Sequence, residues 1–105
     1  MERLRMKDMP VEDRPYEKFE KSGAEYLTDA ELLAIIIRSG TRNETSLDIT
    51  RRIINRYSDG RGLKYLSKAS ISQLCEIKGV GRVKAIQLKA AAELGTRMSR
   101  PESHN

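Results

Sequence analysis

The sequence predicts an all-α fold of five or six short helices, arranged as tandem helix-hairpin-helix-like units of which the first is degenerate. With no Trp, one Phe and four Tyr in 105 residues, the core must be built from Leu, Ile, Val and Ala, a composition that favours helices. Residues that cap helix N-termini stand directly before the apolar runs. No segment is explained better as a strand than as a helix.

The chain length is that of one domain, and we expect its body to span residues 15–97. Residues 1–14 would form an N-terminal extension, and residues 98–105, which lack periodicity, a tail or the start of an interdomain linker. Pro15 suits the first turn of a helix that runs to about Lys21 and stops before the next glycine.

Thr28 and Glu31 have the spacing of a capping box and predict the start of the next helix. The apolar run 32–37 that follows could also be a buried strand. Because the capping box comes directly before it, we expect a buried helix that ends near Ser39 and Gly40.

Four further helices are expected after residue 44. Thr45 or Ser46 caps the first, which would reach residue 57, and we expect a short helix over residues 63–67. Ser70 and Gln73 form a second capping box, before a short helix that the Gly-Val-Gly turn interrupts. The last helix would run over residues 82–97.

The strongest functional signal is the segment 74–88, LCEIKGVGRVKAIQL, which resembles the helix-hairpin-helix pattern. Gly79 and Gly81 allow backbone angles that side chains penalise, and they remove bulk so that a phosphate can approach the main chain. Val80 would point into the core, and Ala85 would let the two helices pack closely. The free amides at the start of the last helix then form an anion site with the helix dipole.

This pattern predicts a module that grips the phosphates of DNA without reading its sequence, since backbone amides carry no base information. Lys78, Arg82 and Lys84 would add positive charge around the hairpin. The alternative is that the hairpin is only a tight turn, used for packing or for contact with a protein. The candidate nucleic-acid-binding residues of this turn are Lys78, Gly79, Val80, Gly81, Arg82 and Lys84.

A second, fainter copy of the unit lies upstream, with its turn at residues 38–44. That turn is longer and has one glycine, Gly40, flanked by Arg38 and Arg42 as further candidate phosphate contacts. Paired hairpins could grip both strands across a minor groove, with Arg51 and Arg52 on the same face. The alternative is a plain αα-hairpin that fills the core.

The charge distribution agrees with an anionic partner. Residues 1–31 carry six basic and nine acidic residues, whereas residues 32–105 carry fourteen basic and six acidic residues. Such an imbalance is typical of nucleic-acid binding, although a solvated basic surface gives the same count. The acidic segment 1–31 could instead contact a protein partner.

Several motifs in order resemble the N-terminal region of the RadC family. They are Lys7-Asp8-Met9-Pro10, residues 13–18, residues 23–35, Arg38-Ser39-Gly40-Thr41 and residues 77–81. The resemblance covers about residues 5–97. It implies a helix-hairpin-helix domain of proteins historically named for DNA repair, followed in the family by a JAB/MPN-type domain that binds zinc through a His-x-His cluster, an Asp and a distant Glu.

This chain lacks those zinc ligands, since its one histidine is His104 in the tail. We therefore expect no catalytic residues, metal or cofactor in it, and any hydrolase activity would reside in the missing C-terminal domain. Cys75, beside apolar residues, is expected to be buried. The alternative function is a protein-interaction or positioning module for that JAB/MPN domain. With no apolar span or leader, we expect a cytoplasmic protein without membrane contact.

Overall fold

A computed structural model describes residues 14–56 and 62–101, and within these ranges all regular structure is helical. The predicted all-α class is therefore confirmed. The elements in chain order are α1 (Pro15–Ser22), the single 3₁₀ turn η3 (Ala24–Tyr26), α2 (Asp29–Ile37), α3 (Ser46–Ile54), α4 (Gly62–Lys68), α5 (Ile71–Cys75) and α6 (Arg82–Ser99). The run 32–37 lies in α2, so the choice of helix over strand is correct.

Three helices begin with complete capping boxes. Thr28 and Glu31 cap α2, and Ser70 and Gln73 cap α5, as predicted. At α3 the cap is Thr45, whose hydroxyl accepts from the Asp48 amide at 3.0 Å while the Asp48 carboxylate accepts from the Thr45 amide at 3.0 Å. These contacts satisfy amides that the first turn of each helix leaves without an intrahelical partner.

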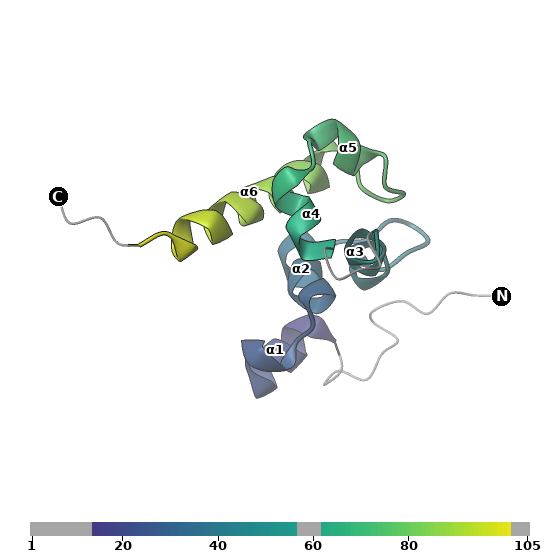
Figure 1. The fold of residues 1–105 in the computed structure, drawn as a ribbon. Coiled ribbons are helices and arrows are strands. Elements are labelled where there is room, and N and C mark those ends of the chain that lie inside the picture. The colour runs from purple at the N-terminus through teal and green to yellow at the C-terminus, as the bar shows by residue number, and fades with distance from the viewer. Residues whose placement is uncertain (1–13, 57–61, 102–105) are drawn as a thin grey trace.

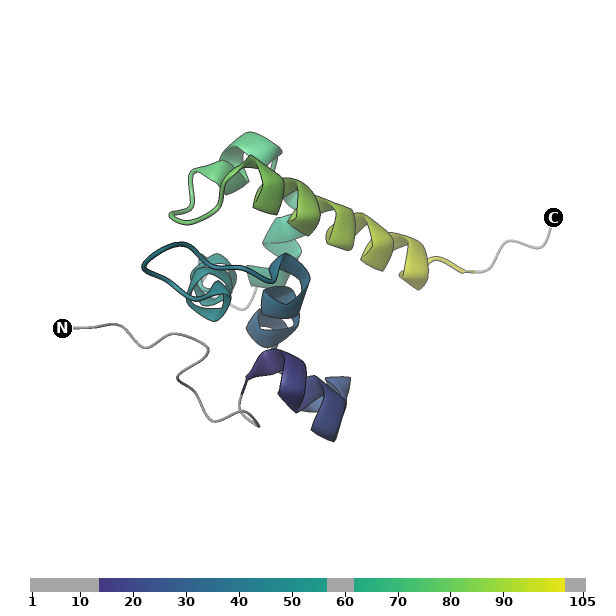
Figure 2. The ribbon, with the colours of Figure 1, turned by 180° about the vertical axis from the view of Figure 1, so that it is seen from behind.

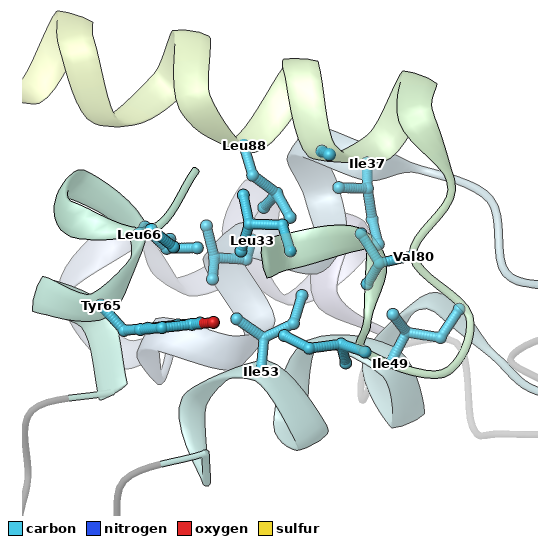
Figure 3. Close-up of a cluster of buried hydrophobic side chains, with 12 residues drawn as sticks. Leu33, Ile37, Ile49, Ile53, Tyr65, Leu66, Val80 and Leu88 are labelled. Carbon is cyan, nitrogen blue, oxygen red and sulfur yellow. The ribbon is translucent and has the colours of Figure 1, made fainter. Parts of the chain in front are cut away.

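The core lies between α3 and α6, and α2, α4 and the hairpin also contribute side chains to it (Figure 3). Ile49 and Ile53 of α3, together with Leu74 and Leu88, are fully buried. Truncating any of them to alanine would cost about 2–5 kcal/mol, because a cavity remains as well as lost apolar burial. The cluster consists of Leu33, Ile37, Ile49, Ile53, Tyr65, Leu66, Ala69, Leu74, Ile77, Val80, Ala85 and Leu88.

The helices are disposed so that two turns reach the same side of the molecule. Both views show the α2–α3 turn beside the α5–α6 turn, while α1 lies at the far end of α2 (Figures 1 and 2). The C-terminal part of α6 extends away from the other helices in both views. Within the described ranges no helix is long and apolar enough to cross a bilayer.

A salt bridge joins α1 to the start of α2. The Lys18 ammonium donates to both carboxylate oxygens of Glu31, at 3.2 and 3.1 Å. Burial by itself would raise the pKa of Glu31, but the Thr28 amide and Lys18, which both donate to the carboxylate, together hold its pKa below its ordinary value. The same carboxylate thus serves the capping box and the contact between helices.

The remaining predictions differ from the structure in detail. The last helix is two residues longer than expected and ends at Ser99, and α5 ends at Cys75, before the buried Ile77. The prediction that Cys75 is buried is wrong, because this residue at the end of α5 is exposed. Residues 1–13, Tyr57 and His104 lie outside the described residues.

Candidate nucleic-acid interface

The hairpin turn is fixed to the domain by Gly79 and Val80. Gly79 has φ of 91°, in the left-handed region that favours glycine. A Cβ at this position would lie 2.9 Å from Cγ1 of Ile49, so the turn rests directly on α3. Val80 is 4% exposed and belongs to the core cluster, as the sequence predicted. The first glycine and the valine therefore shape the turn and anchor it.

Gly81 is a glycine of another kind. Its φ is −89° and its ψ −175°, an extended conformation open to any residue, so the expectation that both glycines need special angles is wrong here. A Cβ at Gly81 would meet no atom within 4 Å. Neither the backbone nor the interior of the domain therefore requires glycine at this position. Because Gly81 has no side chain, the first turn of α6 can be approached from solvent.

That first turn carries unpaired amides. Gly81 is the N-cap of α6 and supplies no side-chain cap, in contrast to Thr28, Thr45 and Ser70 at the starts of α2, α3 and α5. The ladder of α6 begins with the Ala85 amide, which donates to the Gly81 carbonyl at 3.0 Å. The amides of residues 82–84 precede that bond and have no partner within the helix. A helix start of this kind attracts anions through its amides and its dipole.

The α2–α3 turn closes on itself instead. The Thr41 amide donates to the Glu44 carbonyl at 2.9 Å, and a Cβ at Gly40 would lie only 1.9 Å from that oxygen. Gly40 is thus required by packing inside the turn. Arg38 has φ of 63° and ψ of −52°, and the Ser39 amide donates to the Ile37 carbonyl at 2.7 Å, which makes a γ-turn at the end of α2.

A single arginine holds the two turns together. Arg52 of α3 donates through Nη1 to the Lys78 carbonyl at 2.6 Å and to Oε1 of Glu44 at 3.2 Å, and its Nη2 pairs with Oε2 of Glu44. The hydrogen bonds that Arg52 donates to the Glu44 carboxylate raise the pKa of Arg52. Arg52 is therefore engaged inside the protein, whereas its neighbour Arg51 is exposed.

The predicted basic residues stand free around these turns. Lys78 and Arg82 are exposed and Lys84 is half-buried on the hairpin, while Arg38 and Arg42 are exposed on the other turn. Within the described ranges, the ion pairs are Lys18–Glu31, Arg52–Glu44 and Arg97–Glu93, so none involves these five side chains. Their charge is available to an external anion.

Sequence reasoning missed the Glu44–Arg52 pair as an internal bridge and placed Arg52 on the outer face. The available signal was Glu44 directly before the α3 cap, eight residues from Arg52.

In the described part of the chain no group of three or more His, Cys, Asp or Glu side chains is placed to hold a metal ion. The site offers amides, glycines and cations, a combination of groups that suits an anion.

A protein-family model described as "UPF0758 N-terminal" matches residues 6–86. The chain belongs to the UPF0758 family. Its relatives include UPF0758 protein YsxA of Bacillus subtilis strain 168, which is 45% identical over 95 residues. The UPF0758 proteins TTE0897 of Caldanaerobacter subterraneus subsp. tengcongensis and that of Methanococcoides burtonii are each 43% identical over 95 residues.

Each of these alignments covers 90% of this chain but only 40% of the relative. The chain thus spans less than half the length of the UPF0758 proteins it matches. No solved structure matches the fold of the chain. The family is therefore established by sequence, and the fold comes from the structure described above.

Proposed function

We propose that this domain is a DNA-binding module that grips phosphates with the hairpin 77–84, without reading base sequence, as its resemblance to the N-terminal domain of RadC-type proteins suggests. The observation that carries the proposal is the open side of Gly81. A glycine that neither backbone angles nor packing demands sits directly before three free amides of an 18-residue helix. A phosphate oxygen is the ligand that fits that combination.

Charge and attachment support the same reading. Lys78 and Arg82 flank the amides with unpaired cations, and the nearby Glu44 is neutralised by Arg52. Because Gly79 rests on Ile49 and Arg52 holds the Lys78 carbonyl, the amides are fixed before the ligand arrives. A rigid site loses less freedom on binding than a mobile one.

The two turns would contribute differently. At α3 the first amides are already used by Thr45 and Asp48, so that helix start is not a second amide site. The α2–α3 turn would add affinity through the side chains of Arg38 and Arg42, because Gly40, the other candidate contact, is enclosed inside the turn. We expect the α5–α6 turn to make the main phosphate contact and the α2–α3 turn to add a weaker electrostatic contribution. The expected Kd for duplex DNA at moderate salt is roughly 10⁻⁴–10⁻⁶ M.

The test is a pair of glycine substitutions. A Cβ at Gly81 and a Cβ at Gly95 both meet no atom within 4 Å, but Gly95 lies more than three turns further along α6. We expect Gly81→Val to weaken binding to a fluorescent DNA duplex at least tenfold in an anisotropy titration at low salt, and Gly95→Val to bind as the parent does. Equal binding by a folded Gly81→Val variant would remove the hairpin from the interface.

A further inference from the structure

We propose that the outer side of α6 is a docking surface for the region that follows this helix in the longer members of the family. The inference does not rest on DNA binding. We define the outer stripe of α6 as Val83, Ile86, Ala90, Leu94 and Met98. At about 100° per residue these five positions fall within roughly a third of the helix circumference.

The stripe is apolar and uncovered. Val83 is 72%, Ile86 46%, Leu94 60% and Met98 81% exposed. Ala85 and Leu88, which are fully buried, and Ala92, which packs against the core, lie on the opposite side of the helix. A surface helix usually has one apolar side and one polar side. Gln87 and Arg97 lie in the same sector of the helix, and Arg97 pairs with Glu93. The exposed apolar side chains among them, opposite the packed side of α6, fit an interface that the described residues do not occupy.

The end of α6 also lacks support from its own domain. The last residue of α6 that packs against the core is Ala92, yet the helix continues to Ser99 and extends away from the other helices in Figure 2. Helix ends without tertiary packing are marginal in water, since most helical stability in proteins comes from a packed face. Leu94 and Met98 are the apolar residues that would receive such packing.

The length of the relatives identifies the occupant. The matching family model is that of the N-terminal part, and the 95 aligned residues are 40% of YsxA. Most of each relative therefore lies outside the part that corresponds to this chain, and the N-terminal description of the family model implies that it follows that part, beyond α6. A region tethered there meets the stripe at a high effective concentration, so even a modest apolar contact would be populated.

The experiment compares hydrogen exchange in the chain as it stands and in a fusion that continues it, after residue 101, with the corresponding remainder of YsxA. We expect the amides of residues 93–99 to exchange at least tenfold more slowly in the fusion. Leu94→Gln with Met98→Gln, which keeps helix formers at both positions, should abolish that protection. Thr96→Ala, at an exposed position on another side of α6, should retain it.

Two results would overturn the proposal. One is equal exchange of residues 93–99 in the chain and in the fusion. The other is a dimer of the unfused chain, seen by sedimentation, whose residues 93–99 are already protected and lose that protection in Leu94→Gln/Met98→Gln. That result would assign the stripe to a second copy of the chain.

Discussion

The two turns that lie side by side join similar pairs of helices, but they use their glycines in opposite ways. Gly40 in the α2–α3 turn is enclosed by the backbone at Glu44, and the helix after it is capped by Thr45 and Asp48. Gly81 in the α5–α6 turn faces open space, and the helix after it has no side-chain cap. In the α2–α3 turn the polar groups are satisfied internally, whereas in the α5–α6 turn the amides of residues 82–84 have no partner within the helix.

The comparison teaches that a glycine-containing turn is not by itself evidence of a phosphate site. What separates the two turns is whether the amides of the following helix have partners and whether a side chain at the glycine would meet the protein. On both criteria the α5–α6 turn is the candidate interface. The bridge through Arg52 then explains how the closed turn supports the open one.

The largest effect is expected from substitutions at Gly40 and Gly79, where an added Cβ would clash with the protein. Gly40→Ala places a Cβ 1.9 Å from the Glu44 carbonyl oxygen, and Gly79→Ala combines a positive φ with a contact of 2.9 Å to Ile49. We expect each to lower the free energy of unfolding by about 2–4 kcal/mol. Gly81→Ala should change it by no more than about 0.5 kcal/mol. Urea denaturation of the three variants measures the difference, and equal losses would refute the distinction between the glycines.

A smaller effect is expected from the bridge between the turns. Arg52→Met removes the ion pair between Arg52 and the buried Glu44 carboxylate, together with the hydrogen bond to the Lys78 carbonyl. We expect a loss of about 1–2 kcal/mol in unfolding free energy, a value that allows for the partial exposure of Arg52. Arg51→Met, at the exposed neighbouring position, should stay within about 0.5 kcal/mol. If the two variants unfold alike, Arg52 does not hold the turns together.

Lowering the pH should reduce the stability of the domain through a contact outside the candidate interface, because the titrating carboxylate, Glu31, lies at the α1–α2 junction. The pKa of Glu31 is lowered in the folded state, so its contribution to stability is present above the unfolded value near 4.5 and is lost as pH falls through the folded value. We expect Glu31→Gln, which can still complete the capping box, to flatten this part of the stability curve by about 1 kcal/mol. An unchanged dependence between pH 5 and pH 2 would show that Lys18 and Glu31 do not contribute.

The smallest effects concern single cations on the two turns. Arg82→Gln should weaken DNA binding and reduce the slope of log affinity against log salt by about one. Arg42→Gln should do the same to a lesser extent, because only side chains of the α2–α3 turn remain available to a phosphate. Anisotropy titrations at several salt concentrations measure both slopes. A larger loss from Arg42 than from Arg82 would reverse the ranking of the two turns.

Much of the fold was readable from local signals. The capping boxes at Thr28 and Ser70 announce α2 and α5, because a cap and its partner are three residues apart in sequence as well as in space. The inward position of Val80 followed from its place between two glycines. These features depend on neighbours in the chain, which the sequence displays.

Contacts between residues far apart in the chain could not be predicted from the sequence. Arg52 reaches the carbonyl of Lys78, 26 residues away, and no local pattern reports such a partner. The exposure of Cys75 was missed because its apolar neighbours Leu74 and Ile77 are buried while the end of α5 turns the thiol outward. The glycines at 79 and 81 look equivalent in sequence, but in the structure the positive φ of Gly79 and its close approach to Ile49 of another helix distinguish them.

The most direct test of the account follows backbone amides of the ¹⁵N-labelled chain by NMR during titration with a short DNA duplex at low salt. We predict that the amides of residues 81–84 shift together and return on addition of salt, while those of Ser46, Leu47 and Asp48 at the capped start of α3 stay nearly fixed. Absence of shifts at residues 81–84 at millimolar DNA, or larger shifts at the start of α3, would contradict it.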